Sequence, residues 1–94
     1  MRKIKRRDIL KIYSDLLTEL HRESLRKSEN IVLSHVQARI QVPYDRLKTY
    51  IIDLVNLGLI EDATSLKITK KGIKYLKEYG KILNFMRDIG LTYQ

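Results

Sequence analysis

The chain has 94 residues, 44% of them apolar, and a formal net charge of +8 at pH 7. This length suits one small domain. The chain has no cysteine, which excludes disulfide bonds and thiolate metal sites. His21 and His35 are distant in sequence and lack an acidic cluster around them, so we expect no metal and no other cofactor. The lack of cysteine gives no argument for an oxidising compartment, so an intracellular location is the default expectation. No apolar run approaches the roughly 20 residues of a membrane span.

Basic residues are concentrated at the two ends of the chain. Residues 1–27 carry nine basic and four acidic side chains, residues 28–62 carry three and five, and residues 63–94 carry seven and two. Such an excess of lysine and arginine favours a polyanionic partner. This distribution predicts that the two basic ends of the chain contact the polyanion, and that the slightly acidic segment between them contributes less.

A first amphipathic helix is predicted near the N-terminus. Asp8 is a suitable N-cap residue, and Ser28 and Asn30 indicate a loop after the helix. The apolar stripe has the helical spacing of three and four residues and consists of Ile9, Ile12, Tyr13, Leu16, Leu17 and Leu20.

Two more helices follow, joined by a tight turn. Ser34 is the expected N-cap of a short helix over 34–41, and residues 31–32 could pair as a very short strand. Pro43 cannot continue that helix, and its fixed φ suits the start of the next one, predicted over 44–57. Gly58 is the expected C-terminal stop. This is a helix-turn-helix arrangement with a further helix in front of it.

The two sides of the helix over 44–57 differ in polarity. Its apolar positions include Tyr44, Leu47, Ile51, Leu54 and Val55, whereas the other side carries Asp45, Arg46, Thr49, Asp53 and Asn56. A β-hairpin is predicted next, with strands at 59–60 and 66–69 and a turn at 62–65. An isolated hairpin is marginal in water, so we expect it to pack on the helices as a wing.

The last helix is predicted over 70–89, with Thr69 as its N-cap. It presents two apolar series and a row of lysines, Lys70, Lys74, Lys77 and Lys81, and Gly80 leaves its continuity open. One apolar series suffices to pack on the domain. The second follows a heptad spacing and predicts a homodimer interface of coiled-coil type formed by Tyr75, Tyr79, Ile82, Met86, Ile89 and Tyr93.

The segments LKTYIIDLVNLGLI (47–60) and LKITKKGIKYL (66–76) resemble the winged helix-turn-helix superfamily. The matching positions are Leu54, Gly58, Leu59 and Ile60, then Ile68, Thr69, Lys71 and Gly72. The chain is most similar to small basic archaeal winged-helix proteins, of cellular, plasmid or viral origin, that dimerise through a C-terminal helix. The resemblance implies a mainly α fold with a small β-hairpin. It divides the chain into a basic arm (1–7), a winged helix-turn-helix domain (8–69) and a dimerisation helix (70–94).

The resemblance also implies double-stranded DNA as the partner, with the helix over 44–57 in the major groove. Its candidate contacts are Tyr44, Arg46, Lys48 and Thr49. Tyr44 could instead lie over the core, and Arg46 and Lys48 could belong to a solvated helix face. Candidate phosphate contacts come from the second helix, the wing and the arm: Ser34, Arg39, Gln41, Lys67, Lys70, Lys71, Arg2, Lys3, Lys5, Arg6 and Arg7. The arm could equally be a solubilising tail.

We expect a cytoplasmic, nucleoid-associated transcriptional regulator. A nucleoid-type architectural protein is a close alternative, which differs from a regulator in its specificity ratio over random DNA. A winged-helix protein–protein interaction module is a second alternative, favoured by the net charge of −2 over residues 28–62. RNA binding is a third option, but the sequence lacks the aromatic stacking platform that RNA-binding domains usually have. An enzyme is not expected, because the sequence offers no glycine-rich phosphate loop and no nucleophile with a positioned base. No small-molecule ligand is evident.

Overall fold

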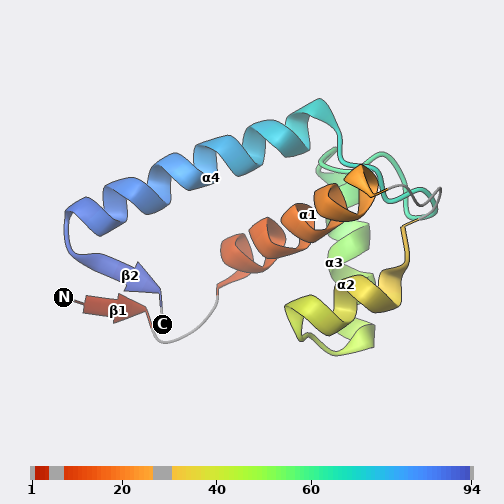
Figure 1. The fold of residues 1–94 in the computed structure, drawn as a ribbon, viewed down its shortest axis with the longest axis horizontal. Helices are drawn as coiled ribbons and strands as arrows, with labels where there is room; N and C mark the ends of the chain where they lie inside the picture. The colour runs from red at the N-terminus through yellow and green to blue at the C-terminus, as the bar shows by residue number, and fades with distance from the viewer. Residues whose placement is uncertain (1, 5–7, 27–30, 94) are drawn as a thin grey trace.

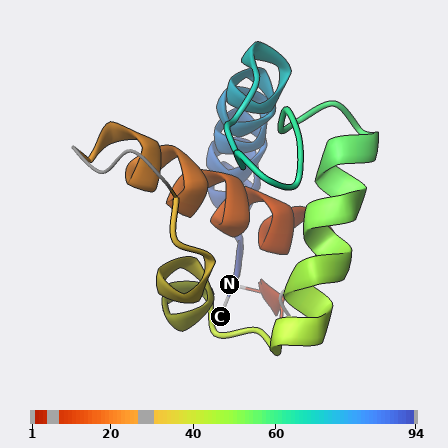
Figure 2. The same cartoon turned by 90° about the vertical axis from the view of Figure 1, so that its right-hand side faces the viewer.

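The computed structural model describes residues 2–4, 8–26 and 31–93, and side chains within 8–26 and 31–91. Two antiparallel neighbours, α1 and α4, run along the long axis (Figure 1). Helix α2 lies along the C-terminal half of α1, and α3 lies beside its N-terminal half (Figure 2). The elements in chain order are β1 (Arg2–Ile4), α1 (Ile9–Leu25), α2 (Leu33–Ile40), α3 (Tyr44–Asn56), α4 (Lys70–Asp88) and β2 (Leu91–Tyr93).

The helix ends follow local capping chemistry in most cases. The Asp8 side chain accepts a hydrogen bond from the Lys11 amide at 2.9 Å, which confirms it as the N-cap of α1. Thr69 caps α4 in the same way by accepting from the Gly72 amide at 3.0 Å. Gly58 has φ +76° just after α3, as expected for a helix stop. The prediction for Ser34 is wrong, because α2 begins at Leu33 and its N-cap is Val32.

The turn between α2 and α3 is made by only a few residues. Gln41 ends α2 in the left-handed conformation, with φ 55°, and Pro43 precedes the first residue of α3 with φ −59°. Residues 31–32 before α2 are not in a strand. A reversal at Gln41 and a fixed proline φ together set the angle between the two helices.

One hydrophobic core joins α1, α2, α3 and the segment 59–69, which we call the wing loop. The members of this core are all apolar and at most 9% exposed: Leu16, Leu17, Leu20, Val36, Ile40, Val42, Leu47, Ile51, Leu54, Leu59, Ile60 and Leu66. The stripe predicted for the first helix supplies three of them. Burial of this kind stabilises by about 25 cal/mol per Å² of apolar surface, so the core fixes where α3 lies.

The wing loop contains one antiparallel β-bridge, between Ile60 and Ile68, in place of the expected two-stranded hairpin. Leu66 adopts the left-handed conformation, with φ 58°, which interrupts the extended backbone that a strand requires. The Asp62 carboxylate accepts from the amides of Thr64 (2.9 Å) and Ser65 (2.7 Å) and closes the turn. The wing is therefore a compact loop.

Helix α4 is continuous through Gly80 and ends at Asp88, one residue before the predicted end. It is pinned to α1, because the Tyr75 hydroxyl donates to the Leu10 carbonyl at 2.6 Å. Gly72 allows the start of α4 to approach the wing loop, since a Cβ there would lie 2.3 Å from the Leu59 carbonyl oxygen. In the part of the chain that the structure describes, no helix is long and apolar enough to span a membrane.

The free basic arm expected for residues 1–7 is not found at residues 2–4. These residues form β1, which pairs in parallel with β2 in the register Arg2–Leu91, Lys3–Thr92 and Ile4–Tyr93. The C-terminal segment likewise leaves the helix and returns through Gly90 (φ +88°) into β2. This ribbon lies at the end of the long axis opposite to the wing loop (Figure 1). Lys5, Arg6 and Arg7 lie outside the described residues.

Candidate nucleic-acid interface

Helix α3 lies at the edge of the molecule beside the N-terminal part of α1, with one face toward the core (Figure 2). Leu47, Ile51 and Leu54 fill the core from that face and are 0–4% exposed. The side chains on the opposite side are exposed and form a row with helical spacing, Asp45, Thr49, Ile52 and Asn56, which we call the outer row. The fold thus buries one stripe of α3 and leaves the reverse stripe free to meet a partner.

A hydrogen bond to α1 sets the position of α3 about its own axis. The Tyr13 hydroxyl donates to the Asp53 carboxylate at 3.0 Å, and the Tyr13 ring packs edge-on against Tyr50, with centroids 6.1 Å apart. Burial, followed by the hydrogen bond and charge of Asp53, raises the pKa of Tyr13 to about 12. The tyrosine is therefore a neutral donor that holds the outer row in a fixed direction.

The flank of α3 that faces the wing loop combines apolar and basic groups. Tyr44 is 46% exposed, so its alternative placement over the core is wrong. The Lys48 ammonium lies 5.0 Å from the centre of the Tyr44 ring, a cation–π contact. A shallow, mainly apolar hollow of about 310 Å³ lies here, lined by Leu33, Tyr44, Lys48, Ile51, Ile52 and Ala63. Arg46, on the other flank of α3, is exposed.

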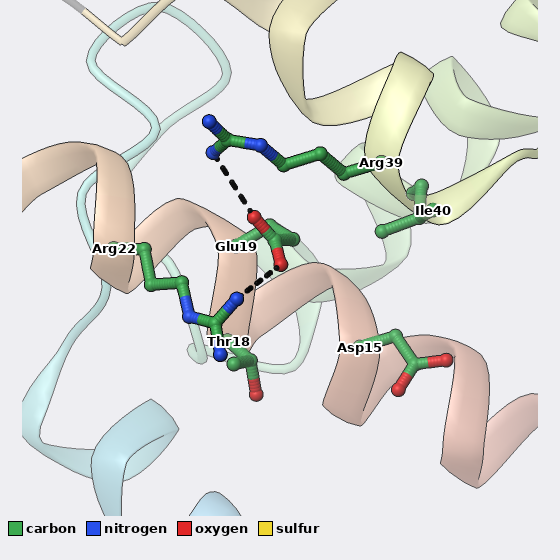
Figure 3. A pocket seen from close by; sticks show the side chains of 6 residues that line it. All are labelled: Asp15, Thr18, Glu19, Arg22, Arg39 and Ile40. Carbon is green, nitrogen blue, oxygen red and sulfur yellow. Dashed lines mark hydrogen bonds and ion pairs between the residues drawn. The ribbon is translucent and has the colours of Figure 1, made fainter.

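Arg39 was expected to contact phosphate, and the structure places it in an ion-pair cluster between α2 and α1 (Figure 3). Its guanidinium lies 2.9 Å from the Glu23 carboxylate and 3.2 Å from that of Glu19. Glu23 is only 2% exposed, so its charge requires this partner. Arg22 contacts Glu19 from the other side at 3.2 Å. Arg39 therefore joins two helices, and its charge is largely neutralised.

The remaining polar candidates on α2 and α3 are exposed. Ser34 and Gln41 lie at the beginning and end of α2, and Gln41 also forms its left-handed C-cap. The Thr49 hydroxyl donates to the Asp45 carbonyl within α3 at 3.2 Å. Such a bond is easily exchanged for one to a base or phosphate, because both partners are exposed.

The basic residues around the wing loop differ in their availability. Lys67 and Lys70 are exposed. Lys71 donates to the carbonyl of Leu57, the C-cap of α3, at 2.8 Å. This bond satisfies a carbonyl at the helix end and brings a positive charge to the negative end of the helix dipole. Lys71 is thus a capping group, and the phosphate contact predicted for it competes with that bond.

Helix α4 carries the predicted lysine row and a separate exposed apolar row. The lysines at 70, 74, 77 and 81 are all exposed, on the side opposite to the buried Gly72 and Tyr79. Lys81 lies 3.4 Å from the Glu78 carboxylate. The exposed apolar side chains near the end of the helix are Ile82 (52%), Phe85 (63%) and Ile89 (57%).

The six positions predicted for the dimer interface divide into two groups. Tyr79 is 6% exposed within the protomer and stacks on Tyr75 at a centroid distance of 6.0 Å, so these two rings already pack inside one chain. Ile82 and Ile89 are exposed and Met86 is partly exposed. The side chain of Tyr93 lies outside the described ones. The available apolar surface is therefore nearer the end of α4 than the heptad spacing predicted.

A protein-family model for the winged helix-turn-helix matches residues 6–87. The chain belongs to this winged helix-turn-helix family. Members are typically non-enzymatic DNA-binding domains, in keeping with a site made of an exposed helix face and a loop. In the part of the chain that the structure describes, no group of three or more histidine or acidic side chains could hold a metal ion. Neither the curated proteins nor the solved structures searched gave a match.

Three residues of this winged helix surface were not singled out from the sequence as contacts. Ile52 and Asn56 complete the outer row of α3, and Phe85 belongs to the apolar row of α4. A helical wheel drawn from the buried positions 47, 51 and 54 places Ile52 beside Thr49 on the outside. Because Ile52 is apolar, it was not considered among the polar candidates for DNA contact, although it is exposed.

Proposed function

We propose that this winged helix protein binds double-stranded DNA with sequence preference and acts as a transcriptional regulator. The observation that carries the proposal is the outer row of α3, four exposed side chains opposite three buried leucine and isoleucine residues. An α-helix fits the major groove and reads bases through such a row. Arg46 and Lys48 flank the row and supply charged contacts, with Arg46 suited to guanine or phosphate.

Phosphate contacts are proposed for the wing-loop end of the molecule. Lys67 on the loop and Lys70 at the start of α4 are exposed, and the neighbouring Lys71 contacts the C-cap of α3. Contacts of this kind give most of the affinity and make it salt-dependent. Arg2 and Lys3 are not part of this surface, because their strand lies at the other end of the long axis (Figure 1). Arg39 is not proposed as a phosphate contact, because its guanidinium forms an ion pair with Glu23.

A homodimer is proposed through the end of α4. Ile82, Phe85 and Ile89 are each more than half exposed and lie along one side of the helix. A second copy of the chain presents the same apolar row, and two such rows are self-complementary about a two-fold axis. The dimer would place two α3 helices on two half-sites of one duplex.

One observation favours an architectural role as the second candidate. Within the lysine row of α4, Lys74, Lys77 and Lys81 point away from the core and lie further along the helix than Lys70, the member of the row assigned to the wing-loop end. A row of lysines binds phosphate without reading bases. If this row supplies most of the affinity, the protein would coat DNA with little sequence preference.

The test is binding to labelled duplexes across a salt series, with single-stranded RNA alongside. We expect the protein to bind the duplex, and the logarithm of its association constant to fall linearly with the logarithm of the salt concentration. Arg46→Ala should reduce discrimination between sequences, whereas the paired change Lys74→Ala and Lys77→Ala should leave discrimination unchanged. If wild type and Arg46→Ala each bind every duplex sequence with equal affinity, the result would support the architectural role. No duplex binding at low salt would reject both roles.

A further inference from the structure

The outer row of α3 contains an isoleucine where a solvated helix face would carry a polar residue. Ile52 is 56% exposed and borders the apolar hollow between α3 and the wing loop. Its neighbours in the outer row are Thr49 and Asn56. An exposed isoleucine alone needs no explanation. Here it continues the apolar surface of the hollow on the exposed side of α3, where the proposed DNA would lie, so we expect an apolar group of the partner to meet it.

The major groove offers one apolar group, the 5-methyl of thymine, and Ile52 has the chemistry to contact it. Asn56 has the side chain that pairs with adenine through N6 and N7. The two residues are four apart, about 6 Å along the helix axis, or nearly two base-pair steps of about 3.4 Å. We propose that Ile52 contacts a thymine methyl group and that Asn56 contacts an adenine about two base pairs away. This inference rests on the proposed DNA binding and names the base pairs that the same site reads.

The charges around the hollow agree with a nucleic-acid occupant. Lys48 lies at its rim, held over the Tyr44 ring, and can reach a phosphate while the apolar wall meets the base edges. Asp45 lies at the N-terminal end of the outer row and disfavours phosphate there. Ile52 and Asn56 lie further along α3, away from this carboxylate.

The test uses deoxyuridine, which differs from thymidine only by the missing methyl group. A preferred duplex is first selected from random sequences with the wild-type protein. Each thymine is then replaced in turn by uracil, and the dissociation constants are measured for wild type and Ile52→Ala. We expect one or two positions at which uracil weakens wild-type binding about fourfold, the effect of one buried methyl group. Ile52→Ala should bind the two duplexes equally at those positions.

Two controls separate this inference from general effects. Ile73→Ala removes a partly exposed isoleucine from α4 and should keep the full response to uracil. Asn56→Ala should lose discrimination at an adenine about two base pairs from the sensitive thymine. If wild type prefers certain sequences but uracil changes nothing at any position, the inference is overturned and the proposed function stands. If no duplex of any sequence is bound, both are overturned.

Discussion

The guanidinium of Arg39 lies 2.9 Å from the carboxylate of Glu23 and joins α2 to α1. Glu23 is 2% exposed, and Arg26 also contacts it at 3.2 Å from a more exposed position. A carboxylate removed from water in this way is stable only with a partner. The first half of the helix-turn-helix is therefore fixed to the domain by charge as well as by the core.

Arg39→Ala should destabilise the fold by about 2 to 3 kcal/mol, because it leaves Glu23 with Arg26 alone. Chemical denaturation measures this change. Arg22→Ala is the matched control in the same cluster, where the side chain is 65% exposed, and should cost less than about 1 kcal/mol. DNA affinity of folded Arg39→Ala should stay within about twofold of wild type. A large loss of affinity with unchanged stability would contradict the structural role.

Gly72 and Gly80 are two glycines in one helix with opposite expected effects. Gly72→Ala should destabilise by more than about 2 kcal/mol, because its Cβ would lie 2.3 Å from the Leu59 oxygen and 2.5 Å from Ile68 Cγ1. Gly80→Ala meets no atom within 4 Å and should stabilise by about 1 kcal/mol through helix propensity. Thermal unfolding of both variants measures the difference. Equal effects would mean that α4 does not press on the wing loop.

Tyr13 should titrate later than an ordinary tyrosine. Its pKa is raised from 10.0 to about 12 by burial and by Asp53. A raised pKa means that the contribution of Tyr13 to stability is complete below pH 10 and is lost as the pH rises through about 12. Tyrosinate absorbance should contain a late step near pH 12, and Tyr13→Phe should remove the contribution of one tyrosine from that step. A variant with the same titration curve as wild type would refute the assignment.

The dimer proposed for α4 depends on its exposed apolar row. Ile82→Glu together with Phe85→Glu should give a monomer by light scattering, because two charges would be buried at the interface. Ile73→Glu, on the same helix but 37% exposed and outside the row, is the control and should leave the dimer intact. A double variant that remains dimeric would show that the subunits meet elsewhere.

The elements that the sequence predicted well are those set by local chemistry. Asp8, Thr69 and Gly58 are cap and stop residues whose effect reaches only three or four residues along the chain. The apolar stripes of α1 and α3 follow directly from helical periodicity. The winged helix-turn-helix family was expected from the resemblance of the segments 47–60 and 66–76.

The predictions that were wrong concern contacts between residues distant in sequence, or a backbone conformation that has no sequence signal. The strand at residues 2–4 exists because residues 91–93 lie beside it, and nothing near the N-terminus signals that pairing. Arg39 resembles a free surface cation until Glu23 is brought under it by the packing of α2 on α1. The wing loop was predicted as a hairpin because Leu66 has no sequence sign of its left-handed backbone. Site residues on this fold are for the same reason harder to predict than its helices.

The most direct test is a map of backbone amide chemical shifts on addition of a duplex to the labelled protein. We predict that the largest changes fall on the outer row of α3 and on the wing loop, with Thr49, Ile52, Asn56 and Lys67 among them. Residues 2–4 and 91–93 should change little. If the chemical-shift changes are confined to the lysine row of α4 and α3 is unaffected, the major-groove role of α3 is contradicted. DNA binding would then rest on contacts between lysines and phosphates.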